Sequence, residues 1–170
     1  MASLVDELVN VLREETRLYS ALEECADEKT QILVHADVPA LEKLTIVEQA
    51  ISDELLALEH KQVQILNDIK TVLGRTEERL TVTTLIGYLA SQQQVQEKLT
   101  IARDDLIAAA KRVQEKNQQN MILLHHAIEM TEFDITLFKS MRQAPETANY
   151  DKNAYNTGTI LGTSGFDAKQ

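Results

Sequence analysis

The sequence contains no tryptophan, and among its 170 residues only five are glycine and two are proline. A sheet protein reverses its chain about every ten residues and needs far more turn-forming residues than this. Hydrophobic residues make up 44% of the chain and charged residues 26%, a composition typical of a folded domain. We therefore expect an all-α protein with long helices.

Positive charge is also scarce. The chain has 17 lysines and arginines against 27 acidic residues, a net charge of −10 that repels phosphate backbones, and no basic cluster with interleaved aromatics offsets it. No apolar run approaches the roughly 18 residues of a membrane span, and residues 1–10 lack a basic region followed by an apolar one. We expect a soluble, cytoplasmic protein with no nucleic-acid partner and no membrane span.

Residues with obvious site chemistry are few. The single cysteine, Cys25, cannot form an internal disulfide and falls on an apolar stripe, where cysteine commonly packs as a small hydrophobe. None of the four histidines stands in a helical H-x-x-x-H or E-x-x-H pair. Phosphate-binding loops, nucleophile elbows and cysteine–histidine arrangements are absent from the sequence. We therefore expect neither an enzyme nor a bound metal or cofactor.

Apolar positions predict a first helix at about residues 3–35. They recur at the four-three spacing of a heptad, interrupted by Glu15 and Lys29. A flanking row of Val5, Leu12 and Tyr19 widens the stripe, so that this helix can meet two neighbours. The main stripe is Leu4, Leu8, Val11, Leu18, Leu22, Cys25 and Ile32.

Two further helices follow. Asp37 can cap a helix that has Pro39 in its first turn, which predicts a second helix at 38–73 ending near Gly74. Thr81 or Thr84 can cap a third at 82–141, with Gly87 able to interrupt its start. At 1.5 Å per residue, roughly 55 residues of the third helix span about 80 Å, against about 50 Å for each of the other two, so about twenty residues overhang.

We predict an antiparallel three-helix coiled-coil bundle in residues 1–142, with an elongated third helix. Residues 143–170 contain Pro145, three glycines and many Asn, Thr and Asp residues, a composition that cannot pack as an amphipathic helix. This segment is predicted to be an irregular C-terminal tail.

The end of the third helix carries more apolar side chains than one packing stripe needs. Two rows coexist there, and methionine is typical of surfaces that repack around partners. We interpret them as a partner-binding surface, although packing against the first helix, the tail or a second copy of the chain is the open alternative. The rows comprise Met121, Leu124, Ile128, Ile135 and Phe138, then Leu123, Met130 and Leu137, flanked by Phe133 and Met141. Asn117 and Asn120 are predicted to be polar core residues that set the helix register.

One set of residues has a recognisable order and spacing along the chain: Leu4, Leu8, Leu12, Glu15, Tyr19, Leu22, Lys29, Asp37, Leu41, Leu44, Glu48, Leu58-Glu59, Asn117, Asn120, Leu123-Leu124 and Tyr150-Asp151-Lys152. Through these residues the sequence resembles the FlgN-type flagellar export chaperones over about residues 4–153. It departs from the family at Gln62, where arginine is frequent, and at Asn153-Ala154, which replaces a frequent glycine.

The resemblance implies a non-enzymatic chaperone of the flagellar type III secretion system. Its client would be the helical terminal segment of a hook-filament junction protein, held by the end of the last long helix so that it neither assembles nor aggregates before export. Export-gate components would be further partners. The open alternative is a structural coiled-coil or scaffold protein that uses the same apolar surface to form a homodimer.

Overall fold

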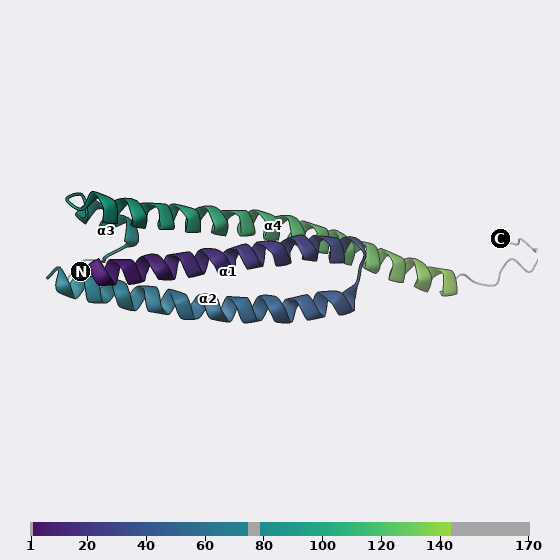
Figure 1. Ribbon diagram of the computed structural model, residues 1–170. Coiled ribbons are helices and arrows are strands. Elements are labelled where there is room, and N and C mark those ends of the chain that lie inside the picture. The colour runs from purple at the N-terminus through teal and green to yellow at the C-terminus, as the bar shows by residue number, and fades with distance from the viewer. Residues whose placement is uncertain (1, 75–78, 144–170) are drawn as a thin grey trace, which may run out of the picture. The chain divides into compact units, whose positions relative to one another are not determined.

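The computed structural model describes residues 2–74 and 79–143, which form four helices and no strand (Figure 1). The helices are α1 (Ala2–Val34), α2 (Val38–Val72), α3 (Val82–Tyr88) and α4 (Gln93–Gln143). The expectation of an all-α protein is confirmed. The chain divides into two units, residues 1–130 and 131–170, and the described part of the second is residues 131–143 of α4. The predicted tail lies outside the described residues apart from Gln143, so the division at residue 142 stays a prediction.

The turn between α1 and α2 follows from three residues. Ala36 has a positive φ of 52°, which reverses the chain, and the Asp37 side chain then accepts a hydrogen bond from the Ala40 amide at 3.0 Å. Pro39 lies in the first turn, where its missing N–H costs no hydrogen bond. This cap starts α2 at the predicted residue.

The predicted third helix at 82–141 is wrong in one respect, because the chain breaks it into α3 and α4. Thr81 caps α3 by accepting a hydrogen bond from the Thr84 amide at 3.1 Å. Leu85 and Leu89 are both buried, and the Leu89 amide donates to the Leu85 and Ile86 carbonyls, which ends the helix. Gly87 weakens the helix here, and burying Leu89 favours the turn that separates α3 from α4.

Ion pairs fix the directions of the long helices within the first unit. Glu7 and Lys29 of α1 pair with Lys61 and Glu48 of α2, in reversed order along the chain, so these helices are antiparallel. Contacts between α1 and α4 instead advance together, from Glu23 with Arg112 to Asp27 with Lys116, so these two run parallel. α1 lies between α2 and α4 in Figure 1. Coiled-coil packing of these helices stays a prediction.

A hydrophobic core lies where α3 joins the long helices. It brings together side chains from all four elements, and it occupies the amino-terminal half of α1. Leu85 and Leu89, on α3 and in the turn after it, contribute buried leucines to it. The α3 region therefore closes this end of the bundle. The core residues are Val5, Leu8, Val9, Val11, Leu12, Ile65, Ile69, Leu85, Leu89, Leu99 and Ala102.

Candidate protein-interaction site

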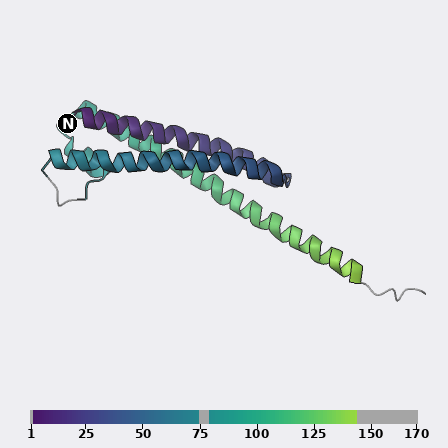
Figure 2. The same ribbon diagram turned by 90° about the horizontal axis from the view of Figure 1, so that it is seen from below.

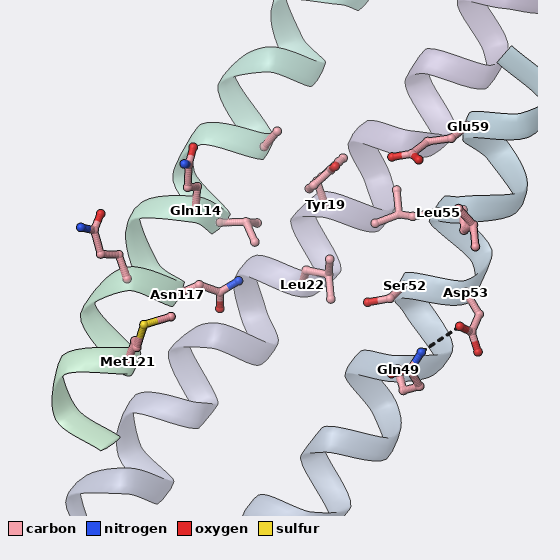
Figure 3. A pocket seen from close by; sticks show the side chains of 14 residues that line it. Tyr19, Leu22, Gln49, Ser52, Asp53, Leu55, Glu59, Gln114, Asn117 and Met121 are labelled. Carbon is pink, nitrogen blue, oxygen red and sulfur yellow. Dashed lines mark hydrogen bonds between the residues drawn. The ribbon is translucent and has the colours of Figure 1, made fainter. Parts of the chain in front are cut away.

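An open groove runs between α2 and α4, with α1 as its floor. Its first hollow has a volume of about 1030 Å³ and is lined by apolar and uncharged polar side chains together with two carboxylates. Figure 3 shows these side chains coming from all three long helices. They are Tyr19, Leu22, Gln49, Ser52, Asp53, Leu55, Leu56, Glu59, Ala110, Val113, Gln114, Asn117, Gln118 and Met121.

A second hollow of about 580 Å³ continues the first toward the carboxyl end of α1. The two share Leu22, Gln49, Ser52, Asn117 and Met121, so they form one surface, here called the α2–α4 groove. The second hollow adds Lys29, Leu33, Leu41, Thr45, Glu48, Asn120 and Leu124.

One end of the α2–α4 groove is acidic. Tyr19 and Glu59 line it, and Glu15 lies one helical turn from Tyr19 on α1. Glu15 is only 2% exposed, and its Oε1 has no hydrogen-bond partner among the described residues. Burial raises the pKa of Glu15 to about 7, and the negative charge of Glu59 adds to the increase. Burial and the two carboxylates also raise the pKa of Tyr19.

At the other end of the groove, the charges of two side chains neutralise each other. Lys29 Nζ lies 2.6 Å from Glu48 Oε2, and both side chains are largely buried. Lys29 interrupts the apolar stripe of α1, and Glu48 is a charged position of α2. Their pairing explains why the stripes tolerate charge there, since each ion supplies the other's counter-charge.

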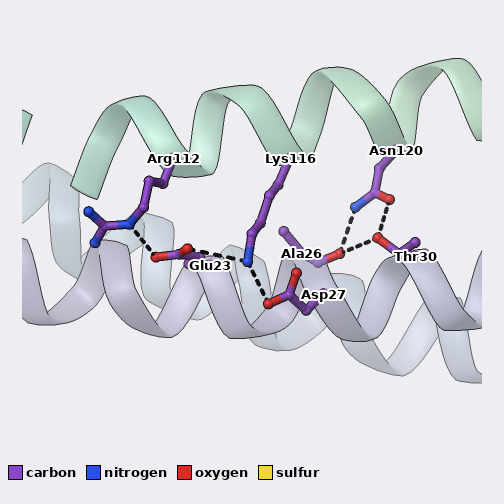
Figure 4. A network of polar contacts seen from close by, with 7 residues as sticks. All are labelled: Glu23, Ala26, Asp27, Thr30, Arg112, Lys116 and Asn120. Atoms are coloured by element: carbon purple, nitrogen blue, oxygen red, sulfur yellow. Dashed lines mark hydrogen bonds and ion pairs between the residues drawn. The ribbon is translucent and has the colours of Figure 1, made fainter. Parts of the chain in front are cut away.

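A polar network holds α4 against α1 on the side shown in Figure 4. Glu23 accepts from Arg112 Nε at 2.9 Å and pairs with Lys116 Nζ at 3.2 Å, and Lys116 also lies 2.5 Å from Asp27 Oδ2. The hydrogen bond from Arg112 is the main reason that the pKa of Glu23 is lowered. Two cations one turn apart on α4 thus share a carboxylate of α1, which opposes slippage of the helices.

Asn120 ends this network inside the protein. Its side chain is 3% exposed, its Nδ2 donates to the Ala26 carbonyl at 2.7 Å, and its Oδ1 accepts from the Thr30 hydroxyl at 2.7 Å. Asn117 differs from the buried polar residue that the stripe predicted, because it is exposed and lines the groove. Three residues turn a helix by about 300°, which leaves the two asparagines about 60° apart. Asn120 therefore reaches the α1 backbone, while Asn117 lies beside it on the exposed side of the contact.

The predicted partner-binding residues of α4 are almost all exposed. Met130, Phe133, Phe138 and Met141 each expose 67% to 69% of their surface. Leu123 is half-buried, and Arg142 lies over the Phe138 ring at 5.8 Å from its centroid. Met121 and Leu124 also line the groove, whereas the others are not among its lining residues. The remaining exposed members are Met121, Leu124, Ile128, Ile135 and Leu137.

Other site types find little support in the part of the chain that the structure describes. There, no group of three or more His, Cys, Asp or Glu residues is arranged to hold a metal ion. None of the described helices has the length and apolar character that crossing a membrane requires. Cys25 is buried, and burial together with nearby carboxylates raises the pKa of its thiol. This environment disfavours a reactive thiolate.

Sequence reasoning missed the groove, although one of its signals was present. The flanking row ending in Tyr19 predicts that α1 meets two neighbours, and the groove lies where those two neighbours, α2 and α4, stand on either side of it. Gln49 and Ser52 gave no signal, and Glu59 was singled out only by the family resemblance, because polar residues on a helix ordinarily indicate a solvated face.

Comparison with known protein families gives a match to one family model. Residues 1–158 match the family model described as FlgN protein. No curated protein sequence and no solved structure matches the chain.

Proposed function

The chain belongs to the FlgN family of flagellar chaperones, and we propose that its client is the helical terminal segment of a hook-filament junction protein. The chaperone would bind this segment in the cytoplasm and prevent its assembly or aggregation before export by the flagellar type III secretion system. Export-gate components would be further partners. We infer that α1, α2 and α4 form an antiparallel three-helix coiled coil that supports the binding surface.

The observation that carries this proposal is the exposed apolar surface of α4 from Met121 to Met141. It includes three of the four methionines and two of the three phenylalanines of the chain. Soluble proteins seldom leave so many large apolar side chains uncovered without a partner. Flexible methionines adapt to the side chains of more than one client, which suits a chaperone.

The free energy gained by burying these side chains is large enough for a useful binding affinity. Burying eight such side chains at roughly 1.5 to 3 kcal/mol each gives about 12 to 24 kcal/mol. Association costs about 4 to 15 kcal/mol, so a net affinity between micromolar and nanomolar is reachable. An amphipathic client helix would lay its own apolar face against these rows. The net charge of −10 would help keep the complex in solution.

Calorimetry with a synthetic terminal peptide of a junction protein tests the proposal. The double variant Leu124→Asp, Phe138→Asp places two charges in the surface and is expected to weaken binding at least about 100-fold. Ile101→Asp, Ile107→Asp is the matched control, because both isoleucines are exposed on α4 outside the two rows. The control should bind as the wild-type protein does.

Unchanged affinity of the Leu124, Phe138 variant would contradict the assignment of this surface. Sedimentation separates the chaperone from the homodimeric scaffold. We expect a monomer that forms a defined complex with the peptide. A concentration-independent dimer that Met130→Asp, Phe133→Asp dissociates would instead support the scaffold.

A further inference from the structure

We propose that the α2–α4 groove is the seat of one amphipathic client helix and that Glu59 receives a lysine or arginine side chain from it. This inference rests on the proposed function and deepens it, since it assigns a second binding surface and a chemical requirement on the client. The surface lies wholly within residues 19–124.

The size of the groove fits a short helix. Its lining extends from Leu41 to Glu59 on α2 and from Ala110 to Leu124 on α4. At 1.5 Å per residue these stretches are about 27 and 21 Å long, which corresponds to a helix of about 14 to 18 residues.

The fold itself supplies a precedent for a helix packed among α1, α2 and α4. Leu85 of α3, with Leu89 just after it, fills the core at the amino-terminal half of α1. Beyond that point, no described residue of α3 lines either hollow of the groove. The three long helices are thus closed by a fourth helix at one end and left open along the groove.

The floor and walls of the groove offer an apolar track. Leu55 and Val113 are buried and Leu22 is half-buried, while Leu56 and Met121 on the two walls are exposed. In Figure 3 the Leu22, Leu55 and Met121 side chains extend into the space between the helices. One apolar stripe of a docked helix would cover them.

The carboxylates of the groove determine which charged side chain a docked helix must carry. The charged residues of the first hollow are Asp53 and Glu59, with no lysine, arginine or histidine. Asp53 accepts a hydrogen bond from Gln49 Nε2 at 2.8 Å, whereas Glu59 has no ion pair or hydrogen bond among the described residues. Its carboxylate extends from α2 toward Tyr19 of α1 (Figure 3). A docked helix would remove it from water.

Glu15 strengthens the requirement for a cation. It is buried next to this end of the groove, and its Oε1 lacks a hydrogen-bond partner. An uncharged occupant would leave Glu59 desolvated beside a second carboxyl group, which is costly without a counter-ion. A lysine or arginine places its apolar stem along the leucines and its charged head at Glu59. A second copy of this chain, with a net charge of −10, fits the acidic end poorly.

A double-mutant cycle tests the inference with the same synthetic junction-protein peptide. Each lysine or arginine of the peptide is replaced by glutamine in turn, and every peptide is titrated against the wild-type protein and Glu59→Gln. We expect one position at which the replacement weakens binding to the wild-type protein about tenfold but leaves binding to Glu59→Gln unchanged. Glu54→Gln, an exposed glutamate of α2 outside the groove, is the control and should behave as the wild type.

A steric variant tests the location independently of charge. Ser52→Trp fills the groove from α2 and should weaken binding at least tenfold, whereas Ala57→Trp, at an exposed position of α2 outside the lining, should not. Failure of the peptide to bind the wild-type protein would overturn the proposed function. Normal binding with no position coupled to Glu59, or normal binding to Ser52→Trp, would overturn this inference alone.

Discussion

Lys29 of α1 and Glu48 of α2 form an ion pair of 2.6 Å whose two side chains are only 23% and 17% exposed. Removing one partner leaves the other charge partly buried without compensation, so Lys29→Met or Glu48→Met should each lower the free energy of unfolding by about 2 kcal/mol. The double variant should recover most of this loss. Urea denaturation measures all three. Lys111→Met, which breaks the exposed pair with Glu115, is the control and should change stability by less than about 0.5 kcal/mol.

Asn120 and Asn117 form a second matched test. Asn120→Ala removes two hydrogen bonds in a buried position and should lower the free energy of unfolding by about 1 to 3 kcal/mol. Asn117→Ala changes an exposed side chain and should have an effect of less than about 0.5 kcal/mol. Equal losses in thermal or urea denaturation would contradict the different environments of the two residues.

Glu15 makes stability depend on pH. Its pKa is raised from 4.5 to about 7 in the folded protein, so the folded state keeps a proton that the unfolded chain releases. Its contribution to stability is therefore complete below pH 4.5 and is lost as the pH rises toward about 7, by up to about 3 kcal/mol.

Urea denaturation between pH 4.5 and 8 measures this effect. Glu15→Gln removes the titrating group, so its stability should fall less over this range than that of the wild type. Glu24→Gln, at an exposed position of α1, should keep the wild-type slope. Parallel profiles for wild type and Glu15→Gln would show that burial does not hold the proton on this carboxyl.

Two residues with positive φ should respond in opposite directions. Ala36 has a φ of 52°, so Ala36→Gly should stabilise the protein by about 0.5 kcal/mol by relieving backbone strain. Gly74 has a φ of 67°, and an added Cβ would meet no atom within 4 Å. Gly74→Ala should therefore lower stability by about 1 kcal/mol through the backbone alone. Differential scanning calorimetry can compare the two.

The sequence predicts those parts of the fold in which local chemistry and periodicity agree. Asp37, Pro39 and the heptad stripes place α1 and α2 within a residue of their expected bounds. The sequence allowed an interruption at Gly87, whereas the structure ends α3 at Tyr88 and begins α4 at Gln93. Only the core at the end of the bundle makes it favourable to turn the chain between Leu89 and Gln93.

The candidate site was also predictable from the sequence only in part. Large apolar residues such as Met130 and Phe133 indicate a binding surface by being more numerous than one stripe requires, and the structure leaves them exposed. Glu59 has no such signal, because a glutamate on a helix is usually solvated. Its significance comes from the groove beside it and from Glu15 behind it, which only the packing of α1 against α2 brings together.

Asn120 is the last residue of α4 that is buried among those the structure describes, although the helix continues to Gln143. Amide protons before this point can exchange with solvent only when packed helices separate, whereas those after it need only a local opening of the helix. Hydrogen exchange should therefore reveal two levels of protection along one unbroken helix. A bound client would raise the protection of the residues after Asn120. Part of the free energy of client binding would therefore be used to hold this end of the helix in its folded conformation.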